Sequence, residues 1–142
     1  MPQRIDPYKG YRFLVEIEGI QQAAFAECSG LGSEIEVVEY RDGGEGSPVR
    51  KMPGRVRYPD IVLKWGVTDS RELYDWHLQL INGTLVRKNG SIILLDDEGQ
   101  LKVRWNFSEA WPSKWEGPRL NARGNDVAIE SLTLTCERLE QA

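Results

Sequence analysis

The sequence lacks the features that mark several large classes of protein. Its 142 residues include only two cysteines and one histidine. The longest uninterrupted apolar runs, such as residues 92–95, are far shorter than the roughly 20 residues that cross a bilayer. We therefore expect neither a disulfide framework nor a membrane-spanning helix. The first seven residues contain no apolar segment, so we also expect no secretory signal.

The chain also lacks an excess of positive charge and a metal-binding pattern. Its formal net charge of -4 disfavours general nucleic-acid binding, which depends on Lys and Arg neutralising phosphates. Cys28 and Cys136 are far apart, and no second histidine completes a set of zinc ligands. The simplest interpretation is that both are reduced cysteines on strands. The length is that of one globular domain, residues 1–142, which can bury a core of its own.

What the sequence does contain is period-two alternation of apolar and polar residues, which predicts half-buried strands. The alternating segments are residues 11–17, 34–37, 61–65 and 101–107. In a last long strand, residues 127–138, the apolar positions change from odd to even numbers. This change predicts a bulge at Ser131, or a strand that crosses between two sheets there.

One helix is expected among these strands, at about residues 70–82. Asp69 can cap its start, with Glu72 completing a capping box, and Gly83 can supply the left-handed stop. Four residues fall on one apolar stripe at helical spacing and predict the packing face: Leu73, Trp76, His77 and Leu80. His77 is also the only candidate for a general base near neutral pH, but its place on this stripe favours packing.

Three segments interrupt the alternation. Residues 96–99, Asp-Asp-Glu-Gly, predict a hairpin turn, because their carboxylates lack the spacing of a calcium loop. Residues 41–59 are rich in Gly, Pro and basic residues and predict a long functional loop. Residues 111–118 contain two prolines, which predict an edge strand or an exit from the sheet.

No pattern of catalytic residues emerges. The chain contains neither Gly-x-Ser-x-Gly nor His-Glu-x-x-His, and residues 30–32, Gly-Leu-Gly, precede a strand pattern where a dinucleotide site needs a helix. We therefore expect a protein that is not an enzyme and has no cofactor. Trp111 and Trp115 flank the prolines and could cover a subunit contact or stack on a sugar ring.

Several segments together resemble the inner tube proteins of contractile phage tails and injection systems. The resemblance covers about residues 6–139, and the order and spacing of its segments carry it. These segments are residues 6–8 with Phe13, the turn at residues 29–31, residues 50–54, residues 58–68 leading into the helix, residues 111–118 and residues 121–130.

The resemblance implies a two-sheet β-sandwich or split β-barrel with one flanking helix, which assembles into six-membered rings. Rings stack into a hollow tube within a contractile sheath. The implied partners are further copies of the chain, the sheath, baseplate or spike proteins, tube-terminating proteins and a luminal cargo of protein or DNA, with no small-molecule substrate. Assembly would take place in the cytoplasm, as part of a phage tail or an injection particle.

The same resemblance implies that residues 41–57 form an extended ring-stacking loop. Together with the tryptophan segment, this gives the predicted ring-stacking and subunit interface: Arg41, Asp42, Glu45, Arg50, Lys51, Met52, Arg55, Arg57, Trp111, Lys114 and Trp115. Two alternatives stay open. One is a stand-alone module that binds sugar or peptide through Trp111 and Trp115; the other is a secretion-system ring protein of the same fold that stacks only transiently.

Overall fold

The computed structural model describes residues 9–10, 12–21, 24–41, 43–44 and 46–142. Within them the chain forms nine strands and one helix, which confirms the prediction of a mainly β fold. In chain order these are β1 (Phe13–Ile17), β2 (Glu27–Ser29), β3 (Glu34–Tyr40), β4 (Arg50–Arg57), β5 (Ile61–Gly66), α1 (Glu72–Ile81), β6 (Lys88–Leu95), β7 (Leu101–Glu116), β8 (Ile129–Thr135) and β9 (Arg138–Gln141).

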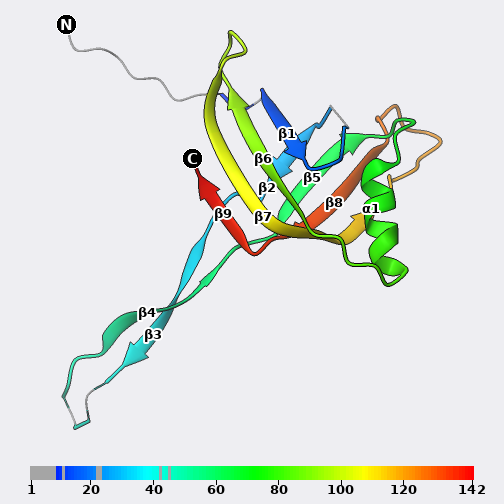
Figure 1. Cartoon of the computed structure of the whole chain (residues 1–142). Helices are drawn as coiled ribbons and strands as arrows, with labels where there is room; N and C mark the ends of the chain where they lie inside the picture. Colours follow the sequence, from blue (N-terminus) through cyan, green and yellow to red (C-terminus); the bar gives the residue numbers. More distant parts are fainter. Residues whose placement is uncertain (1–8, 11, 22–23, 42, 45) are drawn as a thin grey trace, which may run out of the picture.

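One long strand, β7, joins two antiparallel layers (Figure 1). Its first half pairs with β6 and β9, and its second half pairs with β8. β1 extends the first layer beside β6, whereas β5 and β2 extend the second layer beyond β8. Within β7, Glu109 has a φ of 54°, the one positive value among the described non-glycine residues. The two-sheet sandwich or split barrel is therefore confirmed, with β7 shared between its sheets.

The core lies between the two layers and confirms most of the predicted alternation. Ile61, Leu63 and Trp65 of β5 are all buried, with half-buried residues between them. Ile92 and Phe107 close the core from the first layer and belong to the same hydrophobic cluster. Burying such side chains is the main favourable contribution to folding, roughly 1.5–3 kcal/mol for each large one.

The predicted bulge at Ser131 is wrong. β8 pairs with β5 in an unbroken register through Ser131, and the bulge lies opposite β8, in β7 between Pro112 and Lys114. The strand does cross between sheets, but it does so after Cys136, where β9 begins to pair with the first half of β7. The change of the apolar positions from odd to even numbers wrongly predicted a bulge. Val127 and Ile129 are 74% and 37% exposed, so the odd-numbered positions do not belong to the core face.

The predicted long loop at residues 41–59 is partly wrong, because residues 50–57 form β4. This strand pairs with β3 as a separate two-stranded sheet. Pro53 is tolerated because each strand of the pair has only one partner, so one edge of β4 needs no hydrogen-bond donor. Gly54 lies at a bulge opposite Glu36, where a Cβ would come within 2.8 Å of Val38 Cγ2. Apolar and polar residues do not alternate along β4, because every residue of this strand is exposed.

The helix begins two residues later than predicted, and its expected cap is absent. Arg71 stands at the N-cap position, with no side-chain hydrogen bond to the first turn, so the assignment of Asp69 as the cap is wrong. Glu72 does not complete a capping box, because its Oε2 accepts a hydrogen bond from the Gln21 amide at 2.6 Å. The carboxylate therefore fastens the helix start to the segment after β1.

The helix ends as predicted and packs through the predicted stripe. Gly83 has a φ of 94°, and its amide donates to the Leu80 carbonyl oxygen, which confirms the left-handed stop. Leu73 and Trp76 are buried, and Leu80 is half-buried. His77 Nδ1 lies 3.0 Å from the Pro112 carbonyl oxygen, to which it donates in the Nδ1–H tautomer. This contact joins α1 to β7.

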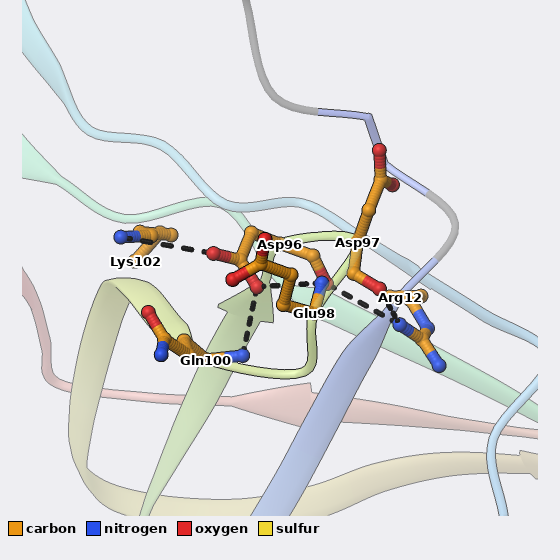
Figure 2. A network of polar contacts seen from close by, with 6 residues as sticks. All are labelled: Arg12, Asp96, Asp97, Glu98, Gln100 and Lys102. Carbon is orange, nitrogen blue, oxygen red and sulfur yellow. Dashed lines mark hydrogen bonds and ion pairs between the residues drawn. The ribbon is translucent and has the colours of Figure 1, made fainter.

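The predicted hairpin turn joins β6 to β7 and is built around one carboxylate (Figure 2). Asp96 Oδ1 accepts hydrogen bonds from the amides of Glu98 and Gln100, at 2.9 and 2.8 Å. Asp96 Oδ2 lies 3.7 Å from Lys102 Nζ. These contacts hold the pKa of Asp96 below its ordinary value of 3.8, and the hydrogen bond from the Gln100 amide has the largest effect.

The turn gives a pH prediction. Because the pKa of Asp96 is lower in the folded state, its stabilising contribution is complete above the unfolded value near 3.8 and is lost as the pH falls through the folded value. Asp96→Asn keeps an oxygen acceptor and loses the charge, so its stability should fall less steeply with acid than that of the wild type. Urea unfolding at several pH values between about 2 and 6 measures this. Asp126→Asn, on an exposed loop, is the control, and equal acid dependence in all three proteins would contradict the prediction.

Candidate functional site

The most distinctive surface of the molecule is the ribbon formed by β3 and β4, here called the projecting ribbon. It extends away from the two-layer body (Figure 1). β3 and β4 contact each other extensively and make few contacts with the other strands or with α1. A two-stranded sheet by itself is at best marginally stable in water. The projecting ribbon is therefore a segment whose order depends on contacts beyond its own two strands.

The projecting ribbon exposes large apolar side chains that a monomer would be expected to bury. Ile35, Val37 and Val38 of β3 are 55%, 62% and 45% exposed. Met52 and Val56 of β4 are 52% and 55% exposed. Contiguous exposed apolar surface marks protein–protein contacts, so these residues identify the projecting ribbon as an interaction surface.

Charges on the two strands of the projecting ribbon are of opposite sign. β3 contains three glutamates, whereas β4 contains three arginines and one lysine. The register sets Glu34 opposite Arg57 and Glu39 opposite Lys51, and Arg57 also forms an ion pair with Glu36 at 3.6 Å. Exposed ion pairs contribute about 0–1 kcal/mol each, so their main effect here is to favour this register over a shifted one.

The predicted interface residues fall in two separate places. Arg50, Lys51, Met52, Arg55 and Arg57 lie on β4, and Arg41 follows β3 directly. Asp42 and Glu45 lie outside the described residues. Trp111, Lys114 and Trp115 lie on the second half of β7, in the body of the molecule. The structure therefore groups the basic residues on the projecting ribbon and separates the tryptophan segment from them.

Sequence reasoning missed the apolar contact residues of β3. Ile35 and Val37 alternate with glutamates, which we interpreted as a strand with one dry face in the core, and this interpretation is wrong. Alternation of apolar and polar residues predicts that one face of a strand is apolar, but it does not show which part of the molecule covers that face. The available signal was the neighbouring Gly- and Pro-rich segment, which indicates a strand at an edge with no body beside it.

The tryptophan segment is a sheet edge, as predicted, and Trp115 is held by specific contacts. Residues 111–116 pair with β8. The Trp115 ring meets the Tyr74 ring edge-on, with centroids 4.8 Å apart, and its Nε1 donates to Glu130 Oε2 at 3.2 Å. A ring fixed between α1 and β8 packs against the core and does not present an open platform.

A second surface with functional potential is the outward side of the first layer, here called the polar face. One row across four strands contains Glu16, Ser91, Asn106 and Glu140, which are aligned in register. Asn106 Oδ1 accepts hydrogen bonds from Ser91 Oγ at 2.7 Å and Arg104 Nε at 3.0 Å. Arg104 also reaches Glu16 at 3.3 Å. A shallow hollow of about 560 Å³ lies over this network.

The polar face is bordered by strand edges. Among the described residues, β1 pairs only with β6, and β9 only with β7. Each of the three pairings β1–β6, β6–β7 and β7–β9 is antiparallel, so β1 and β9 run in opposite directions. Open edges are normally paired or covered. The opposite directions of β1 and β9 match the geometry of an antiparallel pair.

The described residues contain no cluster of three or more His, Cys, Asp or Glu side chains that could hold a metal ion. Burial raises the pKa of the Cys28 thiol to about 11, which keeps it protonated at neutral pH. Cys136 is buried, and neither cysteine forms a disulfide. In the part of the chain that the structure describes, no helix is long and apolar enough to cross a bilayer.

A sandwich with open sheet edges and an exposed apolar ribbon defines a class of structural protein that assembles with copies of itself. The family model of the T4-like virus tail tube protein gp19 matches residues 9–140, so the chain belongs to that family. This confirms the resemblance found in the sequence. Comparison with curated protein sequences gives no match.

Solved structures agree with this membership. A chain from the cryo-EM structure of the anti-feeding prophage cap, a tube-terminating cap, is 31% identical, with a TM-score of 0.85 over all of this chain and 95% of that one. A chain from the PVC sheath-tube complex in its extended state is 33% identical, with a TM-score of 0.81 over 96% and 91%. Hcp1 from Flavobacterium johnsoniae, 15% identical with a TM-score of 0.56 over 91% and 94%, shares the fold.

The contacts of Trp115 predict a structural role that can be measured. Trp115→Ala removes the ring from Tyr74 and the core, and should lower the free energy of unfolding by about 2–4 kcal/mol. Leu120→Ala, on an exposed loop, should change it by less than about 0.5 kcal/mol. Urea unfolding of the unassembled chain measures both. A Trp115→Ala protein as stable as the wild type would contradict this structural role.

Proposed function

We propose that the chain is the structural subunit of a rigid inner tube in a contractile injection system or phage tail. Six copies form a ring, and rings stack into a hollow tube that conveys cargo. The family membership carries this proposal. It is supported by a fold that leaves strand edges open and by a ribbon with apolar side chains that need a partner. The role is mechanical and not enzymatic.

The ring closes through the open edges of the first layer. The β1 edge of one copy pairs with the β9 edge of the next, and the opposite strand directions allow a regular antiparallel ladder. Repeating this contact around a ring gives a closed barrel without edges. The polar face then lines the lumen, where charged and polar side chains such as Arg104 and Glu140 bind water and do not retain unfolded cargo.

Rings stack through the projecting ribbon. Its contact with the next ring is head-to-tail, and such contacts generate filaments because they do not close on themselves. Each chain has a net charge of -4, so whole rings repel one another at close range. Basic residues of β4, such as Arg50 and Lys51, would offset this repulsion by pairing with acidic groups of the adjacent ring.

The similar chains come from a sheath-tube complex, a baseplate and a tube-terminating cap. We extend the same classes of partner to this chain: a contractile sheath outside the tube, a baseplate or spike at one end, a terminator at the other, and a protein or DNA cargo within. Assembly in the cytoplasm, followed by incorporation into a tail or injection particle, fits these partners.

Reversing the charge of β4 tests the stacking role. Arg50→Glu combined with Lys51→Glu should abolish long tubes and leave rings or monomers. Two positive groups of the contact become negative, and the formal net charge of each chain changes from -4 to -8 (-4 - 2 - 2). Negative-stain electron microscopy and sedimentation measure tube length. Arg50→Lys with Lys51→Arg keeps the charge and should form normal tubes. Long tubes of the charge-reversed protein would contradict the stacking role.

A further inference from the structure

Two Asn-Gly dipeptides occur in the chain, at residues 82–83 and 89–90. Asparagine is among the chemically labile residues of proteins. A following glycine makes it more labile, because a residue without a Cβ leaves its backbone nitrogen accessible. The two dipeptides therefore have similar intrinsic chemistry, and any difference between them in the folded protein must come from the structure around each.

The reaction open to both dipeptides is deamidation through a cyclic imide. The backbone nitrogen of the glycine loses its proton and attacks the side-chain carbonyl carbon of the asparagine. A new nitrogen–carbon bond forms, the bond to the side-chain nitrogen breaks, and ammonia leaves. Water then opens the five-membered ring at one of its two carbonyl groups. The product is an aspartyl or an isoaspartyl residue, and the only co-reactant is water.

Ring closure requires a large rotation of the backbone. The glycine nitrogen and the asparagine Cβ must be nearly eclipsed about the Cα–C bond, whereas Asn82 has a ψ of 8°, far from that arrangement. The rotation also separates the glycine nitrogen from its hydrogen-bond partner. The reaction rate in a folded protein therefore depends on the free energy that opens the local structure.

The first dipeptide lies where the structure opens easily. Asn82 is the exposed C-cap residue of α1, and its side chain forms no hydrogen bond with the described residues. The amides of Gly83 and Thr84 donate to carbonyl oxygens of α1. A Cβ built on Gly83 would meet no atom within 4 Å, so the surrounding space is open. Helix ends fray, and rotation at this position breaks only the last bonds of one helix.

The second dipeptide lies where the structure opens with difficulty. Asn89 belongs to β6, the strand between β1 and β7. Its Oδ1 accepts a hydrogen bond from the Glu109 amide at 3.0 Å, and its own amide donates to Glu18 Oε1 at 2.7 Å. Gly90 lies opposite Phe107, whose ring fills the space that a Cβ would need. Rotation here would separate the strands of the first layer.

We propose that Asn82 is a site of spontaneous deamidation in the folded protein and that Asn89 is protected. The chemistry of the two dipeptides is the same, and the structure that must open is different: one helix end for Asn82, and the middle of a sheet for Asn89. Because opening free energies range from near zero at fraying ends to the global value in core strands, this difference determines which asparagine reacts.

Deamidation at Asn82 changes the charge at the end of α1. The new carboxylate changes the formal net charge of the chain from -4 to -5 (-4 - 1). The C-terminal end of a helix has a partial negative charge, and the last turn of α1 contains no basic residue that could offset another one. The isoaspartyl product also lengthens the backbone by one carbon atom. Both products should therefore weaken the glycine stop of the helix.

Peptide mapping tests the proposal within one protein. The purified chain is incubated in mildly alkaline buffer, once folded and once in urea, and the deamidated peptides are separated and measured by mass spectrometry over time. In the folded protein, Asn82 should react at least about tenfold faster than Asn89. In urea the two rates should agree within about twofold, because neither dipeptide then has a structure to open. Equal rates in the folded protein, or a faster reaction at Asn89, would overturn the proposal.

Two variants assign the change in charge to this position. Asn82→Asp should coincide in isoelectric focusing with the acidic species that the wild type forms over time. Asn82→Gln forms the cyclic imide far more slowly, because a six-membered ring is required, and it should remain at its original position. An equal urea unfolding midpoint confirms that the Asn82→Gln protein is folded. The same acidic species formed at the same rate by Asn82→Gln would show that the charge arises elsewhere and would overturn the assignment.

Discussion

The bend within β7 is the constraint on which the rest of the structure depends. Because one strand serves both sheets, the apolar side chains of the two layers face each other over a single core, with Phe107 on one side of the bend and Pro112 on the other. The return of the chain through β8 and β9 follows the same bend, since both strands pair with β7. β9 then stands at one border of the first layer while β1 stands at the other, so the bend also determines which edges are open.

Open edges and an exposed ribbon are liabilities for a monomer, and in the proposed tube they are the means of assembly. The body has its own hydrophobic core, and the projecting ribbon lies outside that core (Figure 1). This separation allows the contacts between copies to be strong without affecting how each copy folds. None of the residues in the buried core cluster comes from β3 or β4.

The polar face has the chemistry that the proposed lumen requires. Its charged residues are arranged in pairs, such as Arg104 with Glu16, and its buried serine is satisfied by Asn106. A surface of this kind binds water well and offers few unpaired groups to a passing protein. The opposite side of the same strands supplies Ile17 and Phe107 to the core, so period-two alternation separates the two roles.

The sequence by itself determined the mainly β fold, the helix with its packing stripe and glycine stop, the turn at Asp96 and the family. These depend on local periodicity, turn chemistry and the order of segments along the chain, which can be read without a structure. Only the tertiary structure decided that Ile35 and Val37 face solvent, that β4 is a strand, and that Glu72 bonds to Gln21 and not to its own helix. The physical reason is that alternation and propensity describe the faces of an element, whereas what covers each face depends on segments far away in the chain.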